Sequence, residues 1–131
     1  MTAGPDRGSV SLLVLGLALP VAIVGMGLVV AIAQLGVARA AAQGAADAAA
    51  LAAAPITFHP FGGDADPGAV ATAVATANGV ELVACECRRD PTWSARVVVV
   101  RVARPVEVLG VFGVEVTASA AAEFTPVDLL R

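Results

Sequence analysis

Residues 8–38 read GSVSLLVLGLALPVAIVGMGLVVAIAQLGVA, and this stretch decides the fold because it contains no charged side chain. Arg7 precedes it and Arg39 follows it. A bilayer core about 30 Å thick is spanned by roughly 20 apolar residues in a helix. Fourteen Leu, Ile and Val residues lie between Val10 and Ile32, and they favour insertion by roughly 4 to 8 kcal/mol. The sequence therefore predicts one membrane-spanning helix near the N-terminus.

The predicted helix continues beyond the membrane. Residues 34–54 (QLGVARAAAQGAADAAALAAA) are rich in alanine, the best helix former. Pro55 should end the helix, because the residue before a proline is pushed out of the helical region. We therefore expect one helix from Ser9 to Ala54. The predicted organisation has four parts: a short cytoplasmic tail or leader at 1–8, a transmembrane helix at 9–35, its extracytoplasmic continuation at 36–54, and a small extracytoplasmic α+β domain at 55–131.

Small residues recur every four positions in the outer half of this helix. Small residues at this spacing allow close approach of a second helix. An alanine-rich helix also shows such rows by chance, so both interpretations stay open. The candidate helix-packing row comprises Gly36, Ala40, Gly44, Ala48 and Ala52.

Asp47 is the only charged residue between Arg39 and Asp64. Arg39 and Asp47 lie two helical turns apart, so one hypothesis is a salt bridge between Arg39 of one subunit and Asp47 of its neighbour. The other is that Asp47 is a solvated residue that keeps its face of the helix soluble.

After a turn-rich loop at 55–68, the chain predicts a short helix and a small sheet. Asp66 is the expected N-cap of the short helix, and Asn78-Gly79 its C-terminal stop. Alternation of side chains along the later segments is typical of half-buried antiparallel strands. The expected strands are Val80–Cys87, Ala95–Arg104 and Val114–Phe124. Residues 105–113 (PVEVLGVFG) form either a fourth short strand or an exposed apolar loop.

The expected fold class is therefore α+β: a long N-terminal helix, a short second helix, and a small antiparallel sheet of three to four strands. Large apolar side chains are few in the outer domain, so Trp93 and residues 109–112 (LGVF) are expected mainly to serve the core. A role of these residues at an interface is the alternative.

No catalytic, cofactor or metal constellation stands out. His59 is the only histidine and lies in the turn-rich loop, away from any nucleophile motif. Cys85 and Cys87 are too closely spaced for an ordinary zinc site. They are a candidate disulfide, although a bond within the chain needs a local bulge or turn; an intermolecular bond and a free buried pair stay open. The protein is expected not to be an enzyme and to need no cofactor.

The charge balance argues against nucleic-acid binding. The net charge is −3, and the eight basic residues, all arginine, are scattered rather than gathered in a stripe. The expected partners are membrane lipid and other protein subunits, in a homo- or hetero-oligomer.

The order of these features resembles the type IV pilin-like proteins, and more closely the TadE-like proteins of tight-adherence (Flp-type) pilus systems. The narrowest resemblance is to the small actinobacterial TadE-like proteins encoded beside secretion and helicase genes. It is carried by Asp6-Arg7-Gly8-Ser9, by Pro20 within the helix, and above all by residues 43–54 (QGAADAAALAAA). It implies a structural component of a pilus or secretion system, with the N-terminus in the cytoplasm and the C-terminal domain outside the cell membrane.

The resemblance also implies a candidate processing site between Gly8 and Ser9, because a glycine precedes the prepilin-peptidase cleavage site in the wider family. The family carries a glutamate five residues after that glycine, where this chain has Leu13. The charge pair between that glutamate and a neighbour's terminal amine is therefore absent. We expect a minor or accessory pseudopilin rather than a main pilin.

Two other functions compete with this interpretation. Ala38-Arg39-Ala40 has the A-x-A form of a signal-peptidase site, which would make the chain a secreted binding module after cleavage near Ala40. Against it, the apolar run far exceeds the usual signal-peptide length of about 7–15 residues. A membrane-anchored sensor domain is the third function considered.

Overall fold

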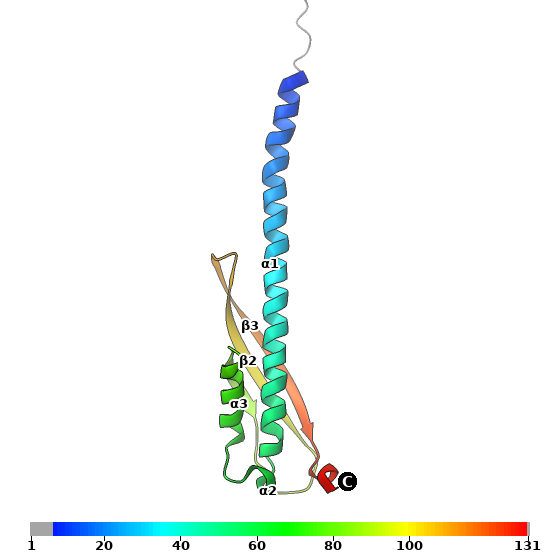
Figure 1. Cartoon of the computed structure of the whole chain (residues 1–131), viewed down its shortest axis with the longest axis vertical. Helices are drawn as coiled ribbons and strands as arrows, with labels where there is room; N and C mark the ends of the chain where they lie inside the picture. Colours follow the sequence, from blue (N-terminus) through cyan, green and yellow to red (C-terminus); the bar gives the residue numbers. More distant parts are fainter. Residues whose placement is uncertain (1–6, 131) are drawn as a thin grey trace, which may run out of the picture.

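The computed structural model describes residues 7–130, with side chains from residue 11 onward. Its main feature is a single helix, α1 (Arg7–Ile56), of 50 residues. At 1.5 Å per residue α1 is about 75 Å long, and its N-terminal half extends well beyond the rest of the molecule (Figure 1). The prediction of one helix crossing from the apolar run into the alanine-rich stretch is confirmed.

The predicted end of this helix at Ala54 is wrong by two residues, because α1 includes Pro55 and Ile56. A proline lacks one backbone N–H, which removes a single bond to the preceding turn. The following residues close a tighter final turn: the Thr57 N–H donates to the Ala54 carbonyl at 3.3 Å, and the Phe58 N–H to the Pro55 carbonyl at 3.2 Å. The Thr57 hydroxyl adds a bond of 2.6 Å to the same Ala54 oxygen.

Two short helices follow α1. The loop expected at 55–68 contains one helical turn, α2 (His59–Gly62). Helix α3 (Pro67–Ala77) is the predicted second helix. Asp66 caps α3 as expected, since its carboxylate accepts from the N–H groups of Gly68 at 3.3 Å and Ala69 at 3.1 Å.

Three strands form one antiparallel sheet in the order β1-β2-β3. Their bounds are β1 (Glu81–Glu86), β2 (Arg96–Val108) and β3 (Phe112–Phe124), followed by a 3-10 helix, η1 (Pro126–Leu130). Strands β2 and β3 pair without interruption from Arg96 opposite Phe124 to Val108 opposite Phe112. The α+β prediction is confirmed, with three strands.

Residues 105–113 do not form a separate fourth strand, and the exposed apolar loop that was the other alternative is limited to the turn at 109–111. They lengthen β2 and β3 and form the hairpin between them. Strand β1 pairs with β2 only as far as Ala103, so β2 has a free edge where Pro105 lies. A proline is tolerated in a strand at such an edge, because a central position would demand its missing N–H.

The core lies between α1 and one face of the sheet, and α3 packs beside α1 on the same face (Figure 1). The inward side chains of β2 include Val98, Val100 and Val102, one of the two alternating rows of this strand. Helix α1 meets them with alanines. Alanine is small enough to let a helix backbone approach the sheet closely, so an alanine-rich helix makes a compact core with few large side chains.

Candidate assembly surface

The outer half of α1 has two different faces made of small residues. The inward face is buried against the sheet and α3. It consists of Ala38, Ala42, Ala45, Ala46, Ala49, Ala50, Ala53 and Ala54. The candidate packing row is not part of this set. Folding of the single chain therefore buries one row of small residues, and the candidate row is a different one.

The candidate row is uncovered at its membrane-proximal end. Gly36, Ala40 and Gly44 are exposed, whereas Ala48 and Ala52 are half-buried. A methyl group added at Gly36 or at Gly44 would meet no atom within 4 Å outside the local helix backbone. The chain itself therefore gives no packing reason for glycine at these two positions.

Arg39 and Asp47 are both exposed on α1. The Asp47 carboxylate accepts from the Gln43 side-chain amide at 3.1 Å. The same amide nitrogen donates to the Ser119 carbonyl on β3 at 3.1 Å. Gln43, which the sequence analysis did not single out, thus joins Asp47 to the sheet and leaves the rest of its carboxylate accessible.

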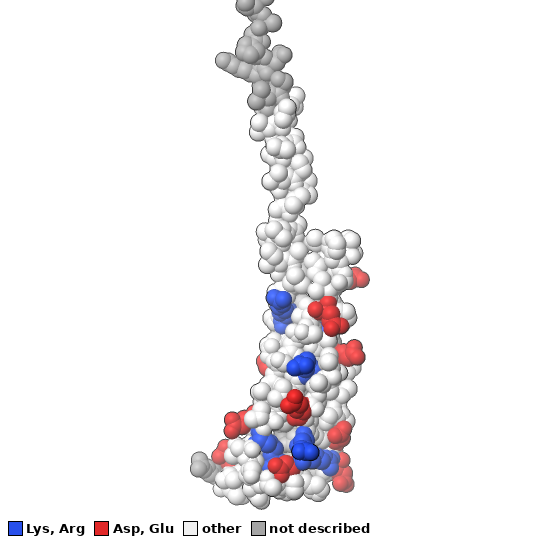
Figure 2. Space-filling view, turned by 180° about the vertical axis from the view of Figure 1, so that it is seen from behind, with Lys and Arg blue, Asp and Glu red and all other residues white. Residues whose placement is uncertain are grey.

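From residue 11 onward, the N-terminal half of α1 is apolar and exposed, apart from the half-buried Gly27 and Ala31. The helical segment Ser11–Ile56 is long and apolar enough to cross a membrane, and its most apolar window has a mean hydropathy of 2.6 with none of it buried. Figure 2 shows charged side chains gathered over the outer domain, and the described part of the helix beyond it carries none on the face in view. This one long apolar helix fits a membrane anchor.

Gly8 and Ser9, the candidate processing site, lie in the first turn of α1. The structure places their backbone in the helix and describes no side chain at these positions.

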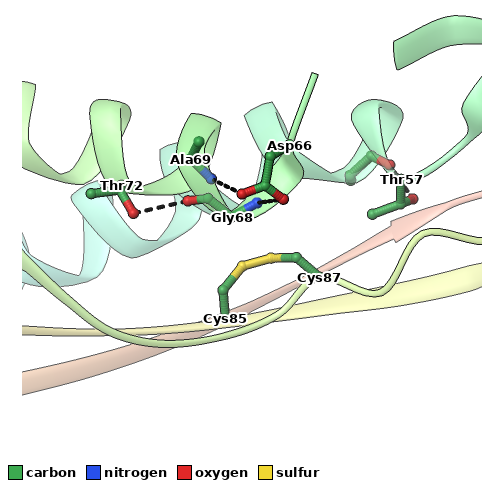
Figure 3. Close-up of a disulfide and its surroundings, with 8 residues drawn as sticks. Thr57, Asp66, Gly68, Ala69, Thr72, Cys85 and Cys87 are labelled. Atoms are coloured by element: carbon green, nitrogen blue, oxygen red, sulfur yellow. Dashed lines mark hydrogen bonds between the residues drawn. A yellow bond between two sulfur atoms is a disulfide. The ribbon is translucent and has the colours of Figure 1, made fainter. Parts of the chain in front are cut away.

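Cys85 and Cys87 are joined by a disulfide within the chain, with their Cα atoms 5.2 Å apart. Residues i and i+2 of a regular strand are farther apart. Here the ladder is irregular between Leu82 and Ala84, and β1 ends at Glu86, so Cys87 lies just outside the regular strand. Figure 3 shows the disulfide between the capped start of α3, where Asp66 binds Gly68 and Ala69, and the sheet.

A polar and aromatic cluster closes the end of the domain that is distant from the apolar helix. The guanidinium of Arg96 donates to the carbonyls of Asp90, Thr92 and Ser94, and at 3.3 Å to that of Thr57. It also lies 5.4 Å from the centre of the Phe58 ring, which packs edge-on against Trp93 at 4.9 Å. These contacts hold the loop before β2 against the end of α1, which is a structural task.

Asp90 is part of the same loop, and its carboxylate accepts from the Thr92 N–H at 2.8 Å. That backbone bond, the Thr92 hydroxyl and the nearby Arg96 charge hold the pKa of Asp90 below its ordinary value of 3.8.

The β2–β3 hairpin corrects the expectation that its large apolar residues serve the core. Val111 is 77% exposed and Phe112 63%, with Leu109 at 43% and Val114 at 41%. Trp93 is half-exposed at the other end of the sheet. Within residues 11–130, no three His, Cys, Asp or Glu side chains gather in a way that could hold a metal ion.

Comparison with known proteins adds one finding. Residues 8–55 match the family model described as "Putative Flp pilus-assembly TadE/G-like". The matched residues coincide with α1, so the match covers the helix and not the sheet. It supports assigning the chain to the TadE-like family. Neither a curated protein nor a solved structure matches the chain.

Proposed function

From the TadE-like assignment of this chain, we propose that it is a minor pseudopilin of a Tad-type pilus or secretion system. The family description points to a role in pilus assembly, which is structural rather than enzymatic. In this proposal α1 anchors the protein in the cell membrane and packs laterally against α1 helices of other subunits. The outer domain is displayed beside the packed helices.

The division of α1 into two small-residue faces carries the proposal. Glycine inside a helix costs about 0.5–1 kcal/mol relative to alanine. Gly36 and Gly44 carry this cost without any contact in the chain that requires glycine. Close approach of a second helix is a physical reason to keep them, because a missing side chain lets two backbones come together.

The proposed contact includes Arg39 and Asp47. Both are exposed, and Asp47 is positioned by Gln43 rather than neutralised by a cation. The part of the Asp47 carboxylate that Gln43 does not contact would be accessible to an arginine of a neighbouring subunit. Such a pair would set the register between adjacent helices more than it would stabilise them, since exposed ion pairs contribute only about 0–1 kcal/mol.

The proposed orientation has the N-terminus in the cytoplasm and the domain outside the cell. The disulfide supports this placement, because disulfides persist in oxidising compartments and are rare in the cytosol. Leu13 in place of the pilin glutamate supports an accessory role rather than that of a main fibre subunit.

The substitution Gly44→Leu tests the proposed packing. A leucine at position 44 points into open space in the single chain, and it raises helix propensity by roughly 0.8–1 kcal/mol over glycine. We expect the subunit to remain folded while crosslinking between subunits in the native membrane drops to background.

Ala73→Leu is the matched control, because Ala73 is exposed on α3, away from the row. It adds the same side chain and should leave crosslinking at the wild-type level. Wild-type crosslinking in Gly44→Leu would exclude the row as the packing surface. A general loss of folded protein in both variants would instead indicate a stability effect, which thermal unfolding of each purified chain detects.

A further inference from the structure

The end of the β2–β3 hairpin is an uncharged apolar loop. Residues 108–114 (VLGVFGV), here called the hairpin tip, lie between Glu107 and Glu115. Most of the tip is exposed, with Val111 and Phe112 the most exposed of its large side chains. An exposed cluster of this kind on a small domain indicates contact with an apolar partner.

The hairpin tip lies at the level where α1 leaves its apolar stretch. The Leu109 N–H donates to the side-chain oxygen of Gln34 at 3.0 Å. Gln34 directly follows the uncharged run Leu12–Ala33, which is about 33 Å long as a helix and so matches a bilayer core of about 30 Å. Figure 1 shows the hairpin running along α1 toward its apolar half.

A shallow groove of about 580 Å³ separates α1 from the strand that leads to the tip. Val30, Ala33 and Val37 line it on the helix side. On the strand side it is lined by the apolar Pro105 and Val106 and by the charged Arg104 and Glu107. The helix side of the groove continues the apolar surface of α1, and the charged side chains on its strand side end where the uncharged tip begins at Val108.

The backbone of the tip holds a leucine in a conformation that is unfavourable for it. Leu109 has a φ of 55°, followed by Gly110 at 67°, and the Val111 N–H closes the turn onto the Val108 carbonyl at 3.2 Å. Glycine, asparagine or aspartate occupies such a position at less cost than leucine. Strain of this kind is typical of functional sites.

We propose that the hairpin tip inserts into the interfacial layer of the same bilayer that holds α1. The partner is the boundary between lipid headgroups and acyl chains, which accepts apolar side chains to a depth of about 5–10 Å. The insertion gives the outer domain a second point of attachment and fixes its rotation about α1. It rests on α1 being the membrane anchor, and it does not depend on the proposed packing row.

Quenching of tryptophan fluorescence by brominated lipid tests this insertion in the full-length chain. The native Trp93 is the internal control, because it packs on Phe58, beyond the end of α1. Phe58 is 24 residues after Gln34, so Trp93 should lie roughly 30 Å or more from the membrane surface. The chain is reconstituted into phosphatidylcholine vesicles with or without bromine on acyl carbons near the headgroup.

We expect wild-type emission to be equal in the two kinds of vesicle. In the double variant Trp93→Phe/Phe112→Trp, the indole at the tip should lose emission by about twofold in brominated vesicles. Val111→Trp, with Trp93 retained, is a second variant that leaves the contact between Trp93 and Phe58 intact. In this variant only the emission of the tryptophan introduced at position 111 should be quenched. Position 111 is the most exposed of the tip, so this change disturbs no packing in the chain.

Equal emission of the tip indole in both vesicles would overturn the proposal. A blue-shifted emission that is not quenched by brominated lipid would also overturn it, because a second protein chain would then cover the tip. Quenching that persists when protein is diluted tenfold in lipid supports insertion, whereas quenching lost on dilution contradicts it.

Discussion

At the scale of single residues, one arginine organises the loop before β2. A guanidinium carries several donors in a fixed plane, and that of Arg96 reaches the carbonyls of Asp90, Thr92, Ser94 and Thr57. The loop has no regular secondary structure of its own. The Arg96 side chain therefore satisfies the carbonyl groups of this segment, as neighbouring strands do in a sheet. It lies beside Phe58, the largest fully buried side chain of the described residues.

Asp90 makes the stability of the same loop depend on pH. Its pKa in the folded chain lies below 3.8, so the carboxylate stabilises the fold above its ordinary pKa, and this contribution is lost as pH falls through the lowered value. In Asp90→Asn we expect a lower free energy of unfolding than wild type at neutral pH. The two proteins should converge in acid below the lowered pKa. Denaturant unfolding followed by Trp93 fluorescence measures this difference at both pH values.

Asp64→Asn is the control for that experiment. It makes the same change of charge at an exposed position of the loop before α3. A neutral-pH loss in Asp64→Asn equal to that in Asp90→Asn would show that net charge, rather than the bond to Thr92, is responsible.

At the scale of elements, the β2–β3 hairpin depends on Gly110. This residue has a φ of 67°, a conformation that costs a residue with a side chain about 1–2 kcal/mol. Apart from Gly110 and its two neighbours in the chain, no residue lies within 4 Å of a methyl group placed there, so the cost comes from the backbone conformation. Gly110→Ala should lower the free energy of unfolding by about 1 kcal/mol, measured by denaturant unfolding in detergent.

Gly113 in β3 supplies the matched control. Its φ is not positive, and a methyl group there also meets nothing within 4 Å. Gly113→Ala should be neutral or stabilising by up to about 1 kcal/mol, because it reduces the freedom of the unfolded chain. Equal losses in both variants would mean that the turn conformation is not what glycine provides at position 110.

Helix α3 shows how far local chemistry could be read from the sequence. The Asp66 cap and the stop at Asn78-Gly79 were both predicted, and Gly79 has the positive φ of a helix terminus. The buried face of α3 is made by Ala71 and Ala75, with Val70 and Val74 half-buried and Ala77 exposed. Caps depend on neighbours in the sequence, but the buried face depends on where α1 and the sheet lie.

At the scale of the whole molecule, α1 combines an apolar half that fits a membrane anchor with an alanine-rich half that forms one side of a core. Its alanines Ala38, Ala42 and Ala45 already belong to the core of the outer domain. Cleavage near Ala40 would remove Ala38 and the partly buried Leu35 from that core. The chain is therefore best suited to remain joined to its anchor.

The intact mass of the protein isolated from its native membrane tests this view. We expect loss of residues 1–8 and a mature chain that begins at Ser9, as prepilin-type processing after Gly8 would give. Loss of residues 1–40 would contradict the pseudopilin proposal and favour a secreted module. An uncut chain would contradict processing at Gly8 and leave a permanently anchored subunit.

The sequence by itself determined the long helix, the α+β class, the cap of α3 and the alternation of β2 and β3. These features follow from charge, periodicity and the conformations of Gly and Pro, which act over a few neighbouring residues. The resemblance to TadE-like proteins also came from the sequence, and the family match over residues 8–55 supports it.

Only the tertiary structure decided which small residues of α1 face the core and which stay free. It also decided that Cys85 bonds to Cys87, that Arg96 holds the loop before β2, and that the hairpin tip reaches Gln34. An alanine-rich helix offers several equivalent rows, and nothing local distinguishes them. Packing of the sheet against the helix determines which row is buried. Contacts between residues 75 positions apart, such as Leu109 with Gln34, form only in that arrangement.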